Sequence, residues 1–246
     1  MSAWRASAWW LGFTLLVPVA LPLAVYTRRK ALRLPPAAGL LYGVAGEDLP
    51  GEPLRLLVLG ESTVVGVGVG QLHAALVGQL AAALAVRYGR PVAWRACGEN
   101  GITAAQARER LLPQVLEQPF DLALLVFGVN DTTRLTSLSR WEAALGGMAE
   151  ALAARGARVA FSSVPPLQHF TALPWLLRRL LGLRAGLLDV RLGELAACLG
   201  VGYHAVELEF SPEYLARDGY HPSGLGYRVW AQGLAVSLAP AAQCAS

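Results

Sequence analysis

The stretch from Leu54 to Gly70 constrains the fold of this chain most strongly. Its first residues, 54–59, are almost all apolar and rich in strand formers, and the run ends abruptly at Gly60. Strands that are buried on both faces of a parallel sheet have nearly continuous apolar runs, so the pattern predicts such a strand. Ser62 follows in the turn, just before leucines at helical spacing. Open α/β sheets bind ligands at the carboxyl ends of their strands, which makes Ser62 a candidate for chemistry.

The rest of the chain repeats this alternation of strand and helix. Strand-like apolar runs are predicted at residues 92–96, 122–127, 158–163 and 203–206. Helices are predicted at residues 71–88, 103–116, 139–155, 187–199 and 223–238. Alternating strands and helices imply right-handed crossovers and therefore a doubly wound parallel sheet. At 246 residues, the chain is long enough for one such α/β domain with a further segment attached.

The amino-terminal segment carries a different signal. No charged residue occurs from Ala6 to Thr27, a run long enough for a helix to cross the hydrocarbon core of a bilayer. Basic residues follow at 28–30 and at 33, whereas a cleavable signal peptide has its charges before the apolar run. The sequence therefore predicts a transmembrane anchor over residues 1–30 that crosses once, with a signal peptide or an interfacial helix as alternatives. The basic cluster favours the cytoplasmic side for the domain that follows.

Composition narrows the organisation of the remaining chain. Proline and glycine punctuate residues 31–53, which predicts a linker, and residues 54–240 are predicted to form one domain. The net charge of +4 is modest and the arginines are scattered, so no nucleic-acid partner is expected. The three cysteines lie far apart without CxxC spacing, which indicates neither a disulfide framework nor a zinc site. The oligomeric state stays open.

No cofactor or metal ion is indicated by the motifs. The glycine-rich turn at residues 66–70 has the pattern GxGxG, which is not the dinucleotide fingerprint, and no lysine follows to make a phosphate loop. These glycines are expected to let the backbone turn and pack tightly. His73, His169 and His204 lack metal-ligand spacing with any cysteine or carboxylate.

Residues suited to acyl transfer lie in four blocks along the chain. Ser62 and Asn130 each follow a predicted buried strand, and Gly101 lies in the loop after another. Asp218 and His221 precede the last predicted helix. Acyl transfer by serine needs a base, a group that orients the base, and donors for the oxyanion, and these five residues could supply all of them. Spacing alone also permits a helix-capping serine, a surface histidine and an ordinary Asn-Asp turn.

The blocks resemble those of a known enzyme superfamily. They are Gly60-Glu61-Ser62, Gly101 in its loop, Gly128-Val129-Asn130-Asp131 and Asp218-Gly219-Tyr220-His221-Pro222. In this order they are similar to the four conserved blocks of the SGNH hydrolases, the GDSL-type lipase/esterase superfamily, over about residues 54–238. The resemblance implies a flavodoxin-like three-layer α/β/α sandwich with a central parallel sheet. It also implies a serine hydrolase that uses no metal or organic cofactor.

The resemblance assigns a role to each matching residue. Ser62 corresponds to the nucleophile, His221 to the base, and Asp218 to the carboxylate that orients the base. The Ser62 N–H, Gly101 and Asn130 correspond to the donors of the oxyanion hole.

Two positions depart from the family pattern. The usual aspartate before the serine is Glu61 here, a conservative change expected to alter a local hydrogen bond more than the mechanism. The second block, which an asparagine usually introduces, fits less cleanly, so Gly98 is an alternative to Gly101 as a donor.

Three further residues are candidates for binding the substrate. Arg134 follows the Asn130 block, and Phe170 and Trp175 lie in the apolar, aromatic segment 164–181. This segment interrupts the strand–helix alternation. It could be a crossover packed in the core, or a lid or acyl-binding wall at a membrane interface.

Together these features predict a membrane-anchored serine esterase. Its partner would be a small-molecule ester, with acyl or lipid character, hydrolysed through an acyl-enzyme intermediate. The alternatives are a carbohydrate O-acetylesterase and a membrane-tethered binding module without catalysis. The sequence does not give the length of the acyl chain, and it does not decide whether the substrate is an ester or a thioester.

Overall fold

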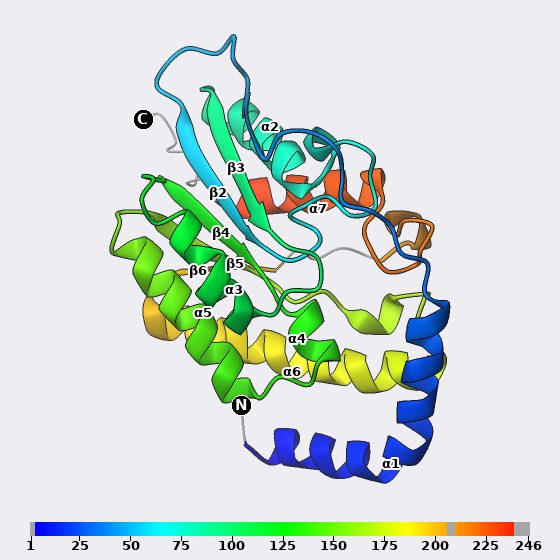
Figure 1. Cartoon of the computed structure of the whole chain (residues 1–246). Helices are drawn as coiled ribbons and strands as arrows, with labels where there is room; N and C mark the ends of the chain where they lie inside the picture. The colour runs from blue at the N-terminus through cyan, green and yellow to red at the C-terminus, as the bar shows by residue number, and fades with distance from the viewer. Residues whose placement is uncertain (1–2, 206–209, 239–246) are drawn as a thin grey trace.

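A six-stranded sheet forms the centre of the molecule (Figure 1). The computed structural model describes residues 3–205 and 210–238, and the sheet has the strand order β1-β3-β2-β4-β5-β6. The strands are β1 (Tyr42–Ala45), β2 (Leu54–Gly60), β3 (Val92–Gly98), β4 (Leu122–Val126), β5 (Arg158–Ser162) and β6 (Gly202–His204). Neighbouring strands pair in parallel, except that β1 pairs antiparallel with β3. The predicted central parallel sheet is confirmed.

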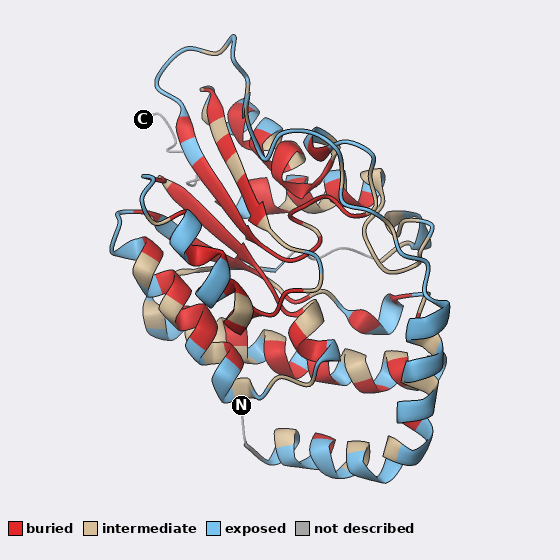
Figure 2. Ribbon diagram, viewed as in Figure 1, coloured by how far each residue is buried: buried red, intermediate tan, exposed pale blue. Residues whose placement is uncertain are grey.

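The central strands are buried on both faces, as their apolar sequences require. Residues 56–59 of β2 are fully inaccessible, and every residue of β4 is buried. In Figure 2 these strands are the continuous red band between the helices. Because neither face of such a strand tolerates water, the chain must cover the sheet on both sides.

Helices on both faces complete a three-layer α/β/α sandwich. On one face, α2 (Leu76–Tyr88) and α7 (Gly224–Leu238) pack against side chains that include Leu56 and Val58. On the other face, α3 (Ala104–Arg110), α5 (Leu138–Ala153) and α6 (Trp175–Leu199) pack against side chains that include Leu57 and Leu59. The connections contain α4 (Val129–Thr133), η1 (Leu72–Ala74), η2 (Leu112–Gln114), η3 (Leu167–His169) and η4 (Pro212–Tyr214).

Strand β1 lies within residues 31–53, where the sequence predicts a linker. Gly43 packs so closely on the neighbouring strand that a Cβ there would come within 2.7 Å of the Trp94 ring. This contact joins segments far apart in the sequence, and the spacing of prolines and glycines does not reveal it. The sheet therefore begins before residue 54.

Helix α6 begins at Trp175, well before its predicted start near residue 187. The second half of segment 164–181 is thus helical, because Pro174 precedes the helix and Leu177 and Leu180 point into the core. The predicted strand 203–206 appears as β6, but residues 206–209 lie outside the described residues. Residues 239–240, at the end of the predicted domain, also lie outside them.

Among the described residues, one helix is long and apolar enough to cross a membrane, and it is α1 (Ala3–Lys30). Only 11% of its most apolar window is buried, and amino-terminal signal sequences share this length and hydropathy. The helix contains Pro18 and Pro22 and bends sharply near them in Figure 1, because proline removes a helical hydrogen bond and kinks the chain. Its first half is fixed to α6, where Trp9 Nε1 donates to the Leu180 carbonyl at 3.0 Å.

Candidate active site

Ser62 lies in the turn that follows β2, at the carboxyl edge of the sheet. Gly60 allows this turn, because a Cβ there would lie 2.3 Å from the Val126 carbonyl oxygen of β4. The strands on either side of β2 run parallel to it, so the loops after β3 and β4 emerge at the same edge. The sheet thereby brings Ser62 near the loop at residues 99–103 and near Asn130.

Side-chain hydrogen bonds connect Ser62, His221 and Asp218 in a row. His221 Nε2 lies 3.0 Å from Ser62 Oγ, and His221 Nδ1 lies 2.7 Å from Asp218 Oδ2. An ionised carboxylate only accepts hydrogen bonds, so the ring proton sits on Nδ1 and Nε2 is left to accept from the serine hydroxyl. The structure thus brings together the three residues that the sequence nominates for the triad.

The loop around Asp218 holds its carboxylate in place. Asp218 Oδ1 accepts the backbone N–H groups of Tyr220 at 3.0 Å and His221 at 3.1 Å. Burial opposes ionisation, but the hydrogen bonds from the His221 ring and from these N–H groups outweigh it and hold the pKa of Asp218 below its usual range. A carboxylate that stays ionised at neutral pH both orients the imidazole and stabilises its protonated form.

The glycine-rich turn packs directly against the loop of His221. Gly68 has φ +111°, and a Cβ there would lie 2.2 Å from the Pro222 carbonyl oxygen. Nearby, the buried Tyr227 hydroxyl of α7 donates to the Val67 carbonyl at 2.7 Å. Gly66 and Gly68 have the tight packing that the sequence predicts for these glycines, whereas a Cβ at Gly70 would meet nothing within 4 Å. The packing of Gly68 sets the His221 loop beside Ser62.

Hydrogen-bond donors lie on the other side of Ser62. Among the described residues, the N–H groups of Ser62 and Gly101 have no acceptor. Asn130 Nδ2 donates to the Ile102 carbonyl at 3.0 Å, and its second hydrogen stays available. Gly98 ends β3 with its α-carbon against Val64, where a Cβ would meet the Val64 Cβ at 2.9 Å, which gives this glycine a packing reason. The geometry therefore favours Gly101 over Gly98 as a donor.

Glu61, the residue before Ser62, is buried. Its carboxyl group accepts the N–H of Gly128 at 2.9 Å and that of Asn130 at 3.2 Å, and so fixes the start of α4. Burial raises the pKa of Glu61 to about 8, with these backbone hydrogen bonds opposing the rise and the charge of Asp131 adding to it. The extra methylene compared with aspartate lets the carboxyl group reach across to the β4–α4 turn.

Replacing Glu61 by Gln is expected to flatten the pH dependence of stability. Between the ordinary pKa of 4.5 and the folded value of about 8, only the folded state holds the proton. The contribution of Glu61 to the unfolding free energy is therefore complete below pH 4.5 and declines as pH rises through about 8. The check is thermal unfolding from about pH 5 to pH 9, where the parent midpoint should fall more steeply than that of Glu61→Gln.

The control for this comparison is Glu109→Gln, which removes one carboxylate from an exposed position of α3. Its midpoint should keep the parent's slope. Equal slopes for the parent and Glu61→Gln would contradict the titration of Glu61 in this range.

An apolar cleft opens beside Ser62 and His221. Its aromatic lining side chains are Phe127, Phe170, Phe210, Tyr214, Tyr220 and Trp230, and Pro165 and Pro166 lie among them. The polar side chains of the lining are Glu61, Ser62, Thr63, Ser163 and His221, besides the two tyrosine hydroxyls, and most of the cleft surface is apolar. A cleft of this composition suits a hydrocarbon group next to one reacting polar group.

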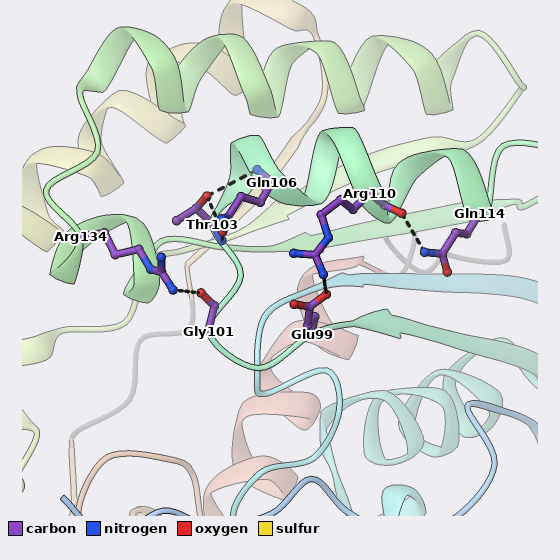
Figure 3. Close-up of polar contacts among 7 residues, drawn as sticks. All are labelled: Glu99, Gly101, Thr103, Gln106, Arg110, Gln114 and Arg134. Atoms are coloured by element: carbon purple, nitrogen blue, oxygen red, sulfur yellow. Dashed lines mark hydrogen bonds and ion pairs between the residues drawn. The ribbon is translucent and has the colours of Figure 1, made fainter. Parts of the chain in front are cut away.

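The predicted substrate-binding residues are placed differently from one another. Phe170 lines the cleft, whereas Trp175 and Arg134 are not among its lining residues. Trp175 starts α6 with 66% of its surface exposed. Arg134 instead donates to the Gly101 carbonyl at 2.8 Å (Figure 3).

Sequence reasoning missed several aromatic residues of the cleft, among them Phe210, Tyr214 and Trp230. Trp230 lies on α7 at helical spacing from the buried residues Tyr227 and Leu234, so the sequence pattern indicates a core residue. The available hint of a role in the cleft is that a large aromatic side chain follows soon after the His221 block. Among the described residues, no group of three or more His, Cys, Asp or Glu side chains could hold a metal ion.

Comparison with known proteins identifies the family. The model of the GDSL-like lipase/acylhydrolase family matches residues 58–229, which include Ser62, Gly101, Asn130, Asp218 and His221. This chain belongs to that family. The resemblance seen in the four sequence blocks is confirmed, and the chain is an SGNH hydrolase.

Similar proteins support this assignment. GDSL-like esterase Rv1075c of Mycobacterium tuberculosis is 28% identical over 232 residues, which cover 85% of this chain and 71% of that protein. The lipase/acylhydrolase of Enterococcus faecalis has a similar fold, with a TM-score of 0.60 and 19% identity over 75% of this chain and 95% of that one. The carbohydrate acetylesterase Est24 of Sinorhizobium meliloti has a TM-score of 0.60 and 17% identity over 75% and 98% of the two chains.

Proposed function

We propose that this chain is a serine esterase that hydrolyses carboxylic esters with an apolar acyl group, through a Ser62 acyl-enzyme. One observation carries the proposal. The hydrogen-bonded row from Ser62 through His221 to Asp218 opens onto a cleft whose lining is mostly aromatic and aliphatic. The same chemistry would be weak without a base in contact with the serine, and the cleft gives the acyl group a place to bind.

The reaction begins when His221 Nε2 takes the proton of Ser62 and Oγ attacks the ester carbonyl carbon. The carbonyl oxygen becomes an oxyanion that accepts hydrogen bonds from the N–H groups of Ser62 and Gly101 and the free amide hydrogen of Asn130. His221 then gives its proton to the leaving alcohol as the C–O bond breaks. In the second half, His221 takes a proton from water, which attacks the acyl-enzyme, and returns it to Ser62 as the acid leaves.

A carbohydrate O-acetylesterase is the second candidate. It is supported by the fold shared with the carbohydrate acetylesterase Est24. The lining argues for the acyl ester, because most of the cleft surface is apolar and would leave many hydroxyl groups of a sugar without hydrogen-bond partners. A binding module without catalysis is less well supported, since all the residues of a working triad are present and in contact.

The proposal includes a membrane tether. Helix α1 exposes large apolar side chains, among them Leu11, Leu15 and Tyr26, which lose surface to water only if lipid or protein covers them. The basic residues 28–30 and 33 follow at its end and suit anionic lipid headgroups. In this proposal residues 1–30 anchor the chain, and the first half of the helix leaves its contact with α6 when it inserts in lipid. The catalytic domain lies on the cytoplasmic side, and its substrate comes from a lipid phase.

One experiment on membranes from cells that express the full chain tests both parts. After a carbonate wash the chain should stay in the pellet, as expected of an apolar helix inserted in lipid. The detergent extract is then assayed on p-nitrophenyl esters from acetate to palmitate, and kcat/KM is expected to rise from acetate by at least about tenfold, since each buried methylene contributes about 0.8 kcal/mol.

Other outcomes separate the alternatives. Release of the chain into the supernatant by carbonate would contradict the proposed membrane tether. Turnover confined to acetate would support the carbohydrate O-acetylesterase, and a lack of turnover on every ester would support the binding module.

A further inference from the structure

The side chains of Asn130 and Arg134 hold the loop that carries Gly101. Asn130 lies in α4 and Arg134 is the residue that caps its carboxyl end, about one helical turn later. Asn130 Nδ2 donates to the Ile102 carbonyl at 3.0 Å, and Arg134 Nη2 donates to the Gly101 carbonyl at 2.8 Å. Consecutive carbonyls of the loop are thus fixed to one helix, and Figure 3 shows the Arg134 contact from α4 to the loop.

The two ends of this loop are fixed by other contacts (Figure 3). At the first end, Glu99 accepts from Arg110 at 2.6 Å. At the second end, Thr103 and Gln106 form a capping box at the start of α3. These contacts set where the loop begins and ends, but they do not touch the peptide groups of Gly101.

Gly101 occupies the third position of a β-turn. Its φ is +82°, a region that glycine enters freely. The turn is closed by the Ile102 N–H, which donates to the Glu99 carbonyl at 3.4 Å and belongs to the same peptide group as the Gly101 carbonyl. Among the described residues, Arg134 is the side chain that bonds the Gly101 carbonyl. Without it, this peptide group keeps only the long turn hydrogen bond, and rotation about Gly101 could turn its free N–H away from the serine.

We propose that Arg134 is a positioning residue for hydrolysis, holding the Gly101 carbonyl so that the Gly101 N–H stays aimed at the oxyanion. The proposal rests on the proposed function, because it needs Gly101 to be an oxyanion donor. Arg134 suits this task, since a guanidinium donates several hydrogen bonds in a fixed plane. Its side chain is exposed, so the contact adds little to stability and acts on geometry.

The test compares Arg134→Ala, Arg134→Lys and Arg110→Ala in the full chain, by kinetics on the best p-nitrophenyl ester. Arg134→Ala is expected to lower kcat by about 10- to 100-fold with KM within about twofold, because a small misplacement of a donor costs about that much. Lys should restore part of kcat, as should added guanidinium chloride at low concentration, compared with sodium chloride. The unfolding temperature should stay the same.

Arg110→Ala is the matched control. Arg110 is an exposed arginine that bonds the same loop, but through the Glu99 side chain and not through a carbonyl next to the donor. It should keep kcat within about twofold, as expected of an exposed ion pair. An equal loss of kcat in both variants would overturn the proposal, and so would a loss confined to KM.

A second readout does not depend on turnover. Amide hydrogen exchange of the peptide at residues 99–103 should be faster in Arg134→Ala than in the parent, because the loop opens more often. Ser62→Ala is measured alongside. If Ser62→Ala is inactive while Arg134→Ala keeps both the kcat and the amide exchange rate of the parent, the proposed role of Arg134 is wrong and the serine mechanism stands. Full turnover in Ser62→Ala would instead overturn the serine mechanism, while faster exchange would still show that Arg134 holds the loop.

Discussion

Ser62→Ala is expected to lower kcat for ester hydrolysis by at least about a thousandfold, with the chain still folded. In the proposed mechanism the Ser62 hydroxyl oxygen forms the acyl-enzyme, and His221 Nε2 lies 3.0 Å from it. Alanine removes the nucleophile and leaves the cleft and the donors in place, so substrate can bind but cannot be acylated. The measurement is kcat and KM on p-nitrophenyl esters, with labelling by a serine-directed fluorophosphonate.

Ser163→Ala is the control for this experiment. Ser163 is a second serine that lines the cleft, and its backbone N–H donates to the His204 carbonyl at 3.1 Å. This variant should keep the parent's rate and its labelling, whereas Ser62→Ala should lose both. A Ser62→Ala chain that still turns over and still reacts with the fluorophosphonate would show that another residue is the nucleophile.

Asp218→Asn is expected to lower kcat by about 10³- to 10⁴-fold without preventing folding. The Asn oxygen can still accept the N–H groups of Tyr220 and His221, which Asp218 Oδ1 accepts now. The Asn nitrogen then replaces Oδ2 next to His221 Nδ1, and it donates where the carboxylate accepted. The ring proton must therefore move to Nε2, which can no longer take a proton from Ser62.

A surface control completes this prediction. Asp121→Asn lies at the opposite end of the same sheet, where Asp121 pairs with Arg55, and it should leave kcat unchanged. The KM and the unfolding temperature of Asp218→Asn should stay close to those of the parent, whereas its kcat should fall. A loss of less than tenfold would argue that another group orients the histidine.

The sequence predicts the central part of the fold because its determinants are local. A continuous apolar run such as 54–59 has one stable place, the middle of a covered parallel sheet, and the strand–helix alternation then limits the topology. The same logic predicts the edge at which the site residues meet. The order of the four blocks completes the prediction of Ser62, Asp218 and His221.

Other features depend on contacts that a local pattern does not encode. Strand β1 joins the sheet through Gly43 and Trp94, two residues from distant segments. The burial that shifts the pKa of Glu61 exists only once α4 closes over it. The position of Arg134 after Asn130 predicts a contact with the substrate. The carbonyl that this flexible side chain reaches depends, however, on how α4 packs beside the loop after β3, and no local pattern gives that packing.

The contact between Gly68 and Pro222 has a consequence for how this protein is made. Ser62 and His221 are 159 residues apart, and the turn at Gly68 receives the last segment of the domain to be synthesised. In the proposed mechanism the nascent chain carries its serine without a base until residues 218–221 have been made. We therefore expect hydrolytic activity to appear only after this segment has left the ribosome and packed against the turn at Gly68. A chain truncated before residue 218 is expected to be inert however well its sheet forms.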